Sequence, residues 1–301
     1  MTKIKIASAQ YPITRHGNFA NWLSHTEKWV QQAADNRARL LLFPEYGAME
    51  LVSILGKDIQ EDIHAQIRAL DNLKEDFCGA FSEMSKKSGA IIVAPSIPVL
   101  HNGKPVNRAF VFSPGGTTGY QDKFLMTRFE DEEWQVTGGD KILALFETDW
   151  GKFGIQICYD VEFPAGAALL ASAGAGLILA PSCTETIRGA TRVHIGARAR
   201  ALENQLYSVV SQTIGNATWS PAVDINYGFA AFYSTPDQNL PEEGILALGK
   251  PQKEGWLYSE LDFSLLETVR KNGQVFNFKD MSRFNRFSES ERVKIRTIKL
   301  N

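Results

Sequence analysis

The sequence contains few cysteines: Cys78, Cys158 and Cys183 are the only three in 301 residues, and their spacing is irregular. A sparse, odd set of thiols does not form the disulfide framework of a small secreted protein. We therefore expect free thiols and a reducing compartment, the cytoplasm. Residues 1–7 run directly into a strand pattern without the apolar core of a signal peptide, which predicts that the mature chain starts at Met1.

Long apolar runs and an excess of one charge are also missing. No stretch approaches the roughly 18 uninterrupted apolar residues of a membrane helix, so we expect no membrane partner. The chain has 32 basic and 34 acidic residues and a formal net charge of -2, which lacks the positive excess typical of nucleic-acid binding. These absences leave a small molecule as the expected binding partner.

Known cofactor and metal signatures are absent as well. There is no phosphate loop, dinucleotide fingerprint or G-x-S-x-G elbow, and we expect no cofactor. The histidines show no paired ligand spacing, which predicts that there is no metal site. They are His16, His25, His64, His101 and His194.

The residues that are present predict an α/β fold. About ten segments rich in β-branched and aromatic residues predict strands, at 3–9, 39–43, 90–95, 106–112, 141–147, 153–158, 176–180, 206–212, 228–233 and 255–261. Close succession of 106–112, 117–121, 141–147 and 153–158 suggests hairpins. Helical periodicity predicts helices at 18–36, 58–87, 162–173, 191–204 and 263–271. So many strands exceed one open sheet and predict a four-layer αββα sandwich, with two mixed sheets face to face and helices outside.

No linker-like tract divides the chain. We therefore expect one domain at 1–271 and an extended C-terminal arm at 272–301. Charged and apolar residues alternate at 292–296, which is typical of an edge strand or of a tail that embraces a second subunit. This pattern predicts that the arm lies at a subunit interface.

Three side chains suited to acyl chemistry come just past or beside strand-like runs: Glu45, Lys123 and Cys158. Such positions meet at one rim of a sheet, where α/β proteins usually place their sites. A helix that starts near Cys158 would stabilise a thiolate, and the Tyr159 N–H would stabilise an oxyanion. Taken one at a time, each has an ordinary alternative: a core cysteine, a solvated carboxylate and a surface lysine.

Together with their surroundings, these residues resemble the nitrilase, or carbon-nitrogen hydrolase, superfamily over essentially the whole chain. The matching motifs are I-A-S-A-Q at 6–10, L-F-P-E at 42–45, D-K-F-L at 122–125, G-G-D at 138–140, G-I-Q-I-C-Y-D at 154–160, L-A-P-S at 179–182 and R-A-R-A-L-E-N-Q at 198–205. The resemblance implies a Glu-Lys-Cys triad, here Glu45, Lys123 and Cys158, on an αββα sandwich. It makes 1–271 the carbon-nitrogen hydrolase domain.

Residues 127–134 and 219–222 look similar to a little-characterised branch, some of whose members are fused to an N-acetyltransferase domain that does not fit in these 301 residues. The resemblance also implies a second glutamate that supports the triad. Counting residues forward from Lys123 places this second glutamate at Glu130. Counting back from Gly138 and Gly139 places it at Glu132, and Glu133 is also close. Expected substrate-binding positions are Tyr46, Trp134, Thr184 and Arg192, although arginines such as Arg192 often form structural salt bridges instead.

The expected activity is hydrolysis of a small amide through a cysteine thioester. Nitrile hydrolysis and N-acyl transfer would use the same triad. A Cys–His hydrolase built on Cys158 and His194, or a non-catalytic scaffold or metabolite-binding protein, are the rival classes. Relatives are commonly oligomeric, so we expect a homodimer or a larger homo-oligomer.

Overall fold

The computed structural model describes residues 3–289 and 296–298. Within these residues the hydrogen-bonded strands form two halves, and each half is built around one long strand. β1 (Lys3–Pro12) pairs in parallel with β2 (Leu40–Leu42) and antiparallel with β14 (Gly255–Asp262). The first half continues outward through β3 (Ile91–Val93), β5 (Lys104–Phe112), β4 (Ile97–His101) and β6 (Thr118–Asp122).

The second half surrounds β10 (Tyr207–Asn216), which pairs in parallel with β9 (Leu177–Ser182) and antiparallel with β12 (Ala231–Tyr233). It is completed by β8 (Lys152–Ile155), β7 (Leu145–Glu147), β13 (Ile245–Leu248) and β11 (Ile225–Asn226). The predicted β5–β6 and β7–β8 hairpins are confirmed. Sequence patterning missed β4, β11 and β13.

The two halves join along one short stretch of β1 and β10. Among the described strands, these two pair across the halves only where 10–12 lie beside 212–214. Nearby, the Ser8 hydroxyl donates to Val210 O at 2.7 Å and the Ser211 hydroxyl donates to Ala9 O at 2.7 Å. The two expected sheets are therefore layers of a single hydrogen-bonded network.

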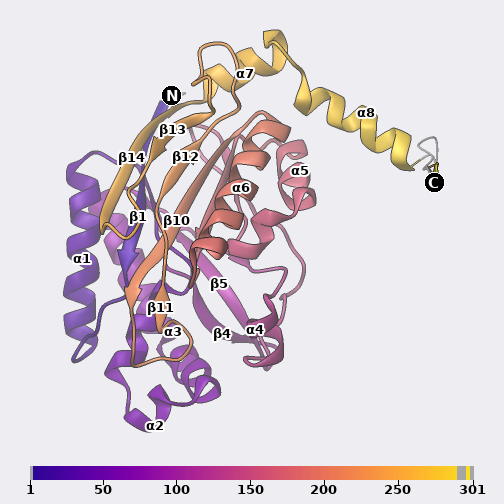
Figure 1. Ribbon diagram of the computed structural model, residues 1–301. Coiled ribbons are helices and arrows are strands. Elements are labelled where there is room, and N and C mark those ends of the chain that lie inside the picture. The colour runs from indigo at the N-terminus through magenta and orange to yellow at the C-terminus, as the bar shows by residue number, and fades with distance from the viewer. Residues whose placement is uncertain (1–2, 290–295, 299–301) are drawn as a thin grey trace.

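Helices cover both outer faces of these layers (Figure 1). α1 (Phe19–Asp35) and α3 (Ile63–Ser88) cover the first half, and α5 (Pro164–Ser172) and α6 (Ile187–Asn204) cover the second. Alternate residues of β1 point in opposite directions: Ile6 joins the core cluster that reaches α5 and α6, whereas Ala7 joins the cluster under α1 and α3. The predicted α/β layered sandwich is confirmed.

The predicted helix at 58–87 is divided into two helices. α2 (Lys57–Gln60) ends before Asp62, whose side chain accepts hydrogen bonds from the His64 and Ala65 N–H groups and so caps the start of α3. Aspartate is a strong N-cap residue because it satisfies donors that have no partner in the first helical turn. Apolar periodicity does not reveal this break.

The C-terminal region is helical where it is described. α7 (Phe263–Asn272) is followed by α8 (Asn277–Glu289), which extends away from the body (Figure 1). The expected arm is therefore helical over 277–289, and its place at a subunit interface stays a prediction. Residues 292–295, which carry most of the alternating pattern, lie outside the described residues. None of the helices in 3–289 combines the length and apolar character that a membrane crossing demands.

Gly196 in α6 allows a close approach to the 3-10 helix η2 (Cys158–Glu162). A Cβ at Gly196 would lie 2.8 Å from Val161 O, whereas a Cβ at Gly79 in α3 would meet no atom within 4 Å. We predict that Gly196→Ala lowers the free energy of unfolding by about 1–3 kcal/mol because η2 is displaced. Gly79→Ala should raise it by up to about 1 kcal/mol. Urea unfolding measures both, and effects of the same sign would contradict this packing.

Candidate active site

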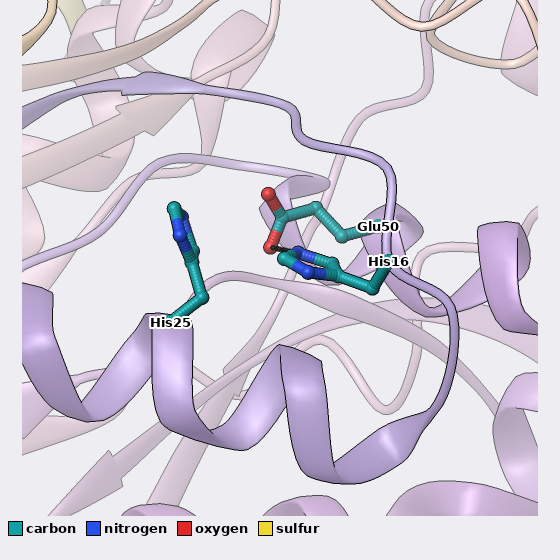
Figure 2. Close-up of side chains that lie close together, drawn as sticks. All are labelled: His16, His25 and Glu50. Atoms are coloured by element: carbon teal, nitrogen blue, oxygen red, sulfur yellow. Dashed lines mark ion pairs between the residues drawn. The ribbon is translucent and has the colours of Figure 1, made fainter.

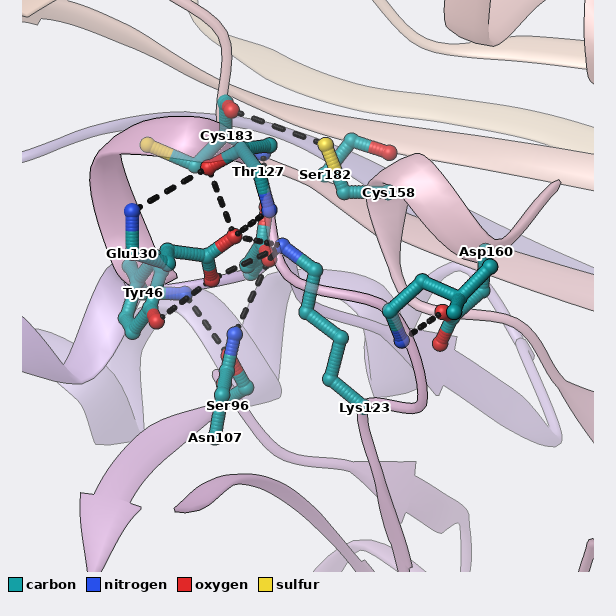
Figure 3. A network of polar contacts seen from close by, with 12 residues as sticks. Tyr46, Ser96, Asn107, Lys123, Thr127, Glu130, Cys158, Asp160, Ser182 and Cys183 are labelled. Carbon is teal, nitrogen blue, oxygen red and sulfur yellow. Dashed lines mark hydrogen bonds and ion pairs between the residues drawn. The ribbon is translucent and has the colours of Figure 1, made fainter. Parts of the chain in front are cut away.

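A cavity of about 770 Å³ contains the three side chains singled out from the sequence, Glu45, Lys123 and Cys158. They follow β2, β6 and β8, so strands from both halves of the network contribute. Lys123 and Cys158 point from separate segments toward one polar cluster (Figure 3). The structure therefore brings all three together.

Lys123 lies between two buried carboxylates. Its Nζ is 2.7 Å from Glu45 Oε1, and 2.8 and 2.6 Å from the two oxygens of Glu130. Burial alone would lower the pKa of Lys123, but the charges of Glu130 and Glu45 outweigh it and raise that pKa well above its ordinary value. Lys123 is therefore a permanent ammonium ion.

The two carboxylates differ in how well their charge is stabilised. Burial would raise the pKa of Glu130, but the Lys123 charge and hydrogen bonds outweigh it, and the net effect lowers that pKa. Burial raises the pKa of Glu45 to about 7, with the Glu130 charge adding to the effect and Lys123 opposing it. Glu45 is consequently the carboxylate that exchanges a proton near neutral pH.

Both Glu45 oxygens are held in place. Oε1 also accepts a hydrogen bond from Asn107 Nδ2 at 2.9 Å, and Oε2 accepts one from the Cys183 N–H at 2.8 Å. Asn107 lies on β5, and the sequence analysis did not identify it. A single amide side chain in an apolar strand does not by itself indicate a site. These donors fix the orientation of the carboxylate.

Cys158 starts η2 with φ 48°, in the left-handed region that a residue with a Cβ rarely adopts. Its Sγ donates to Cys183 O at 3.7 Å. Burial, followed by the Glu45 charge, raises the pKa of the Cys158 thiol well above its ordinary value. The expected thiolate at a helix N-terminus is wrong, because Cys158 begins a short 3-10 helix and α5 starts only at Pro164.

Asp160 connects the cysteine segment to the lysine segment. Its two oxygens accept hydrogen bonds from the Phe124 and Leu125 N–H groups at 3.0 and 2.8 Å. Burial raises the pKa of Asp160 to about 6, and these backbone bonds oppose the rise. Asp160 belongs to the motif around Cys158, but nothing in that motif predicted a role for it.

The structure distinguishes the candidate supporting glutamates. α4 (Arg128–Glu132) begins with a capping box in which Glu130 Oε2 accepts from the Thr127 N–H at 2.9 Å. Glu132 contacts Arg128 at 2.7 Å, and both side chains are exposed. The expectation for Glu132 is wrong, since residues two apart on a helix do not face the same side. Glu133 is likewise exposed.

All four expected substrate positions line the cavity, but most have protein partners. The Tyr46 hydroxyl donates to Glu130 Oε1 at 2.7 Å, so Tyr46 contributes to the charge cluster. The Thr184 hydroxyl donates to Tyr227 O at 2.7 Å. Arg192 is exposed and contacts Glu162 at 3.4 Å.

Two aromatic residues also line the cavity. Trp134 is buried edge-on against Tyr46, and within the described part of the chain its indole N–H has no hydrogen-bond partner. Tyr159 lines the cavity, and its ring contacts Phe163 edge-on. The oxyanion role of the Tyr159 N–H stays a prediction.

His194 does not form the Cys–His pair of the rival interpretation. Its Nδ1 lies 2.8 Å from the Tyr233 hydroxyl and its Nε2 lies 3.0 Å from Gln212 Oε1, while its ring stacks on Phe229. Burial lowers the pKa of His194 to about 4. Both ring nitrogens are therefore engaged away from Cys158.

Comparison with known proteins agrees with this arrangement. Residues 5–271 match the family model described as carbon-nitrogen hydrolase. "Probable hydrolase YhcX" of Bacillus subtilis (strain 168) is 32% identical over 280 residues, covering 93% of this chain and 54% of the relative. This chain therefore spans about half the length of that relative. "Omega-amidase NIT2" of Danio rerio is 28% identical over 280 residues, covering 90% of this chain and 92% of the relative.

Solved structures show the same fold. Saccharomyces cerevisiae Nit3, described as a member of branch 10 of the nitrilase superfamily, has a TM-score of 0.72 at 27% identity, with 90% of this chain and 94% of that chain covered. A carbon-nitrogen hydrolase from Helicobacter pylori G27 has a TM-score of 0.76 at 21% identity, covering 97% and 99%. The resemblance drawn from the sequence motifs is thus confirmed, and the chain belongs to the carbon-nitrogen hydrolase family.

Proposed function

We propose that this carbon-nitrogen hydrolase cleaves the C–N bond of a small amide through a thioester on Cys158. The observation that carries the proposal is the buried ammonium of Lys123, which lies between Glu45 and Glu130 in the same cavity as the thiol. Relatives named omega-amidase support an amide as the substrate.

In the first step, Glu45 takes the proton of Cys158 as the sulfur attacks the amide carbonyl carbon. A base whose pKa is about 7 is matched to this task at neutral pH. Negative charge then develops on the carbonyl oxygen, where the Lys123 ammonium and the Tyr159 N–H stabilise it. The product of the step is a tetrahedral intermediate and a protonated Glu45.

In the second step, the intermediate collapses and the C–N bond breaks. Glu45 transfers its proton to the departing ammonia or amine, which leaves a thioester on Cys158. Glu45 then removes a proton from a water molecule, which attacks the thioester carbon and releases the acid. The returned proton restores the thiol. Glu45 and Cys158 exchange the proton, whereas Lys123 and Glu130 form a stable ion pair and keep their charges.

Nitrile hydrolysis and N-acyl transfer share the attack by Cys158 and differ in the substrate or in the acceptor. Amide hydrolysis is the better supported activity because several relatives are named omega-amidases. Ammonia release from an amide in the absence of an added amine acceptor separates hydrolysis from transfer.

We also propose that the enzyme is cytoplasmic and forms a homodimer or a larger homo-oligomer. The three cysteines are free, which supports a reducing compartment. α8 extends from the body, which supports an arm that contacts a second copy of the chain (Figure 1). The division into a domain at 1–271 and an arm at 272–301 is part of this proposal.

Replacement of the nucleophile tests the mechanism. We predict that Cys158→Ala reduces ammonia release from responsive amides to background while the thermal unfolding midpoint stays close to that of the wild type. Cys78→Ala is the matched control, because Cys78 lies in α3 outside the cavity. Retained amidase activity in Cys158→Ala would exclude the proposal.

The pH dependence tests the role of Glu45. Only the ionised carboxylate accepts a proton, so kcat/KM should fall about tenfold per pH unit below a pKa of about 7 and level off above it. The Glu130 charge raises the pKa of Glu45, and Glu130→Gln should therefore move the acidic limb to lower pH. Glu132→Gln, the matched control, should leave the limb in place. Profiles that coincide in all three proteins would contradict this assignment.

A further inference from the structure

A second cluster of ionisable side chains lies outside the cavity. His16, His25 and Glu50 come from the loop after β1, from α1 and from the 3-10 helix η1 (Gly47–Ile54), respectively. One donor atom from each lies within 4.8 Å of the other two. Figure 2 shows the Glu50 carboxylate beside the His16 ring, and the His16 and His25 ring centroids are 5.1 Å apart. None of the three residues lines the cavity.

The Glu50 carboxylate is buried and already oriented. Its Oε2 accepts a hydrogen bond from the Tyr11 hydroxyl at 2.8 Å, and its Oε1 accepts one from the Thr14 N–H at 2.7 Å. Each oxygen keeps lone-pair capacity beyond these bonds. Hydrogen bonds of this kind fix the ligating carboxylates of metal sites.

The two histidines present nitrogen atoms that the protein does not satisfy. Within the described residues, the Nε2 atoms of both His16 and His25 are buried without a hydrogen-bond partner. His16 Nε2 is 3.5 Å from Glu50 Oε2, which is longer than a charge-assisted hydrogen bond. Buried polar atoms are nearly always paired. Two imidazole rings, each with an unpartnered buried nitrogen, beside one carboxylate therefore point to a missing ligand.

We propose that His16, His25 and Glu50 form a structural site for a divalent transition-metal ion, with Zn²⁺ the best fit. Two imidazole nitrogens and a carboxylate oxygen are donors that Zn²⁺ accepts. This site goes beyond the sequence expectation, because no short-range spacing links residues that meet only in the fold.

The required rearrangement is small. Ligand atoms at about 2.0–2.2 Å from Zn²⁺ lie roughly 3.3–3.6 Å apart. The three donor atoms lie within 4.8 Å of one another, so each separation must shrink by at most roughly 1.5 Å. The backbone N–H of His16 donates to Ser53 Oγ at 2.9 Å, and this bond anchors the loop to η1. His25 is only partly buried, so rotation of its side chain closes the site and solvent can supply a further ligand.

A metal ion here would clamp three segments, one of which, η1, directly follows the catalytic cluster in the chain. η1 begins directly after Tyr46, whose hydroxyl bonds to Glu130, and Glu45 precedes Tyr46. The ion would hold η1 against the β1–α1 connection and take no part in the chemistry at Cys158. Its loss should therefore affect stability before it affects the reaction.

The test uses the untagged full chain, stripped with a chelator and then titrated with Zn²⁺. We expect one tightly bound Zn²⁺ per chain by elemental analysis and a rise in the thermal unfolding midpoint on the order of 5 °C at saturating metal. His25→Gln should weaken Zn²⁺ binding at least tenfold and remove the rise. His64→Gln, at an exposed position of α3, is the matched control and should behave as the wild type.

A second measurement covers the case in which His25→Gln does not fold. Co²⁺ bound to the wild-type chain should give a visible d–d absorption without the sulfur-to-metal charge transfer that ligation by Cys158 or Cys183 would produce. A wild-type chain with neither stoichiometric Zn²⁺ nor this Co²⁺ band overturns the proposal. Unchanged Zn²⁺ affinity in a folded His25→Gln protein, or a thiolate charge-transfer band, would also overturn it.

Discussion

A single buried ammonium ion, Lys123, paired with two buried carboxylates determines the properties of this site. Removing an isolated charge from water costs several kcal/mol, and such a charge persists only with a well-placed partner. Glu130 forms the closer pair with Lys123, and it also accepts from Tyr46 and Thr127. Glu45 is therefore the second anion on one cation. This shortage of positive charge, added to burial, is why the pKa of Glu45 rises to about 7.

The same shortage explains the state of the nucleophile. Cys158 shares the positive charge of Lys123 with two carboxylates. Burial and the Glu45 charge therefore keep its thiol protonated at rest. The proposed reaction then needs a base that is strong enough to accept a proton and free to return it. Glu45 meets both conditions because Asn107 and the Cys183 N–H fix its position without neutralising it. Activation and general-base catalysis are thus two consequences of one buried charge cluster.

The fold supplies the rigidity that this arrangement requires. Two residues of the site, Tyr46 and Cys158, have positive φ angles, which persist only where the surrounding structure holds the backbone. Asp160 contributes by binding the backbone after Lys123, and Gly196 lets α6 pack closely on η2. The strained positions lie at the ends of paired strands, where the hydrogen-bonded network anchors them.

The sequence predicted the parts of the site that follow apolar strands, because a strand end has a local signature. Glu45, Lys123 and Cys158 were singled out in this way, and the resemblance to the superfamily assigned them to a triad. Glu130 was not separated from Glu132, because the phase of the short helix α4 depends on the Thr127 cap. Asn107 and Asp160 act through contacts that are remote in sequence and leave no pattern.

The same limitation applies to the elements and to the second cluster. The break between α2 and α3 at Asp62 arises from a side-chain cap, which apolar periodicity does not register. β4, β11 and β13 are short and gain their pairing from neighbouring strands. His16, His25 and Glu50 meet only after β1, α1 and η1 have packed together. Their shared location is a property of tertiary structure.

The most direct test of the account is the rate at which iodoacetamide alkylates Cys158 as a function of pH, followed by peptide mass spectrometry in the wild type and in Glu45→Gln. Cys78 is the internal reference, because burial raises the pKa of its thiol to about 11 without a contact to the cluster. We predict a wild-type rate that follows a group titrating near pH 7 and a Cys158 profile without that inflection in Glu45→Gln, with Cys78 unchanged. Equal pH profiles for Cys158 in the two proteins would contradict the account.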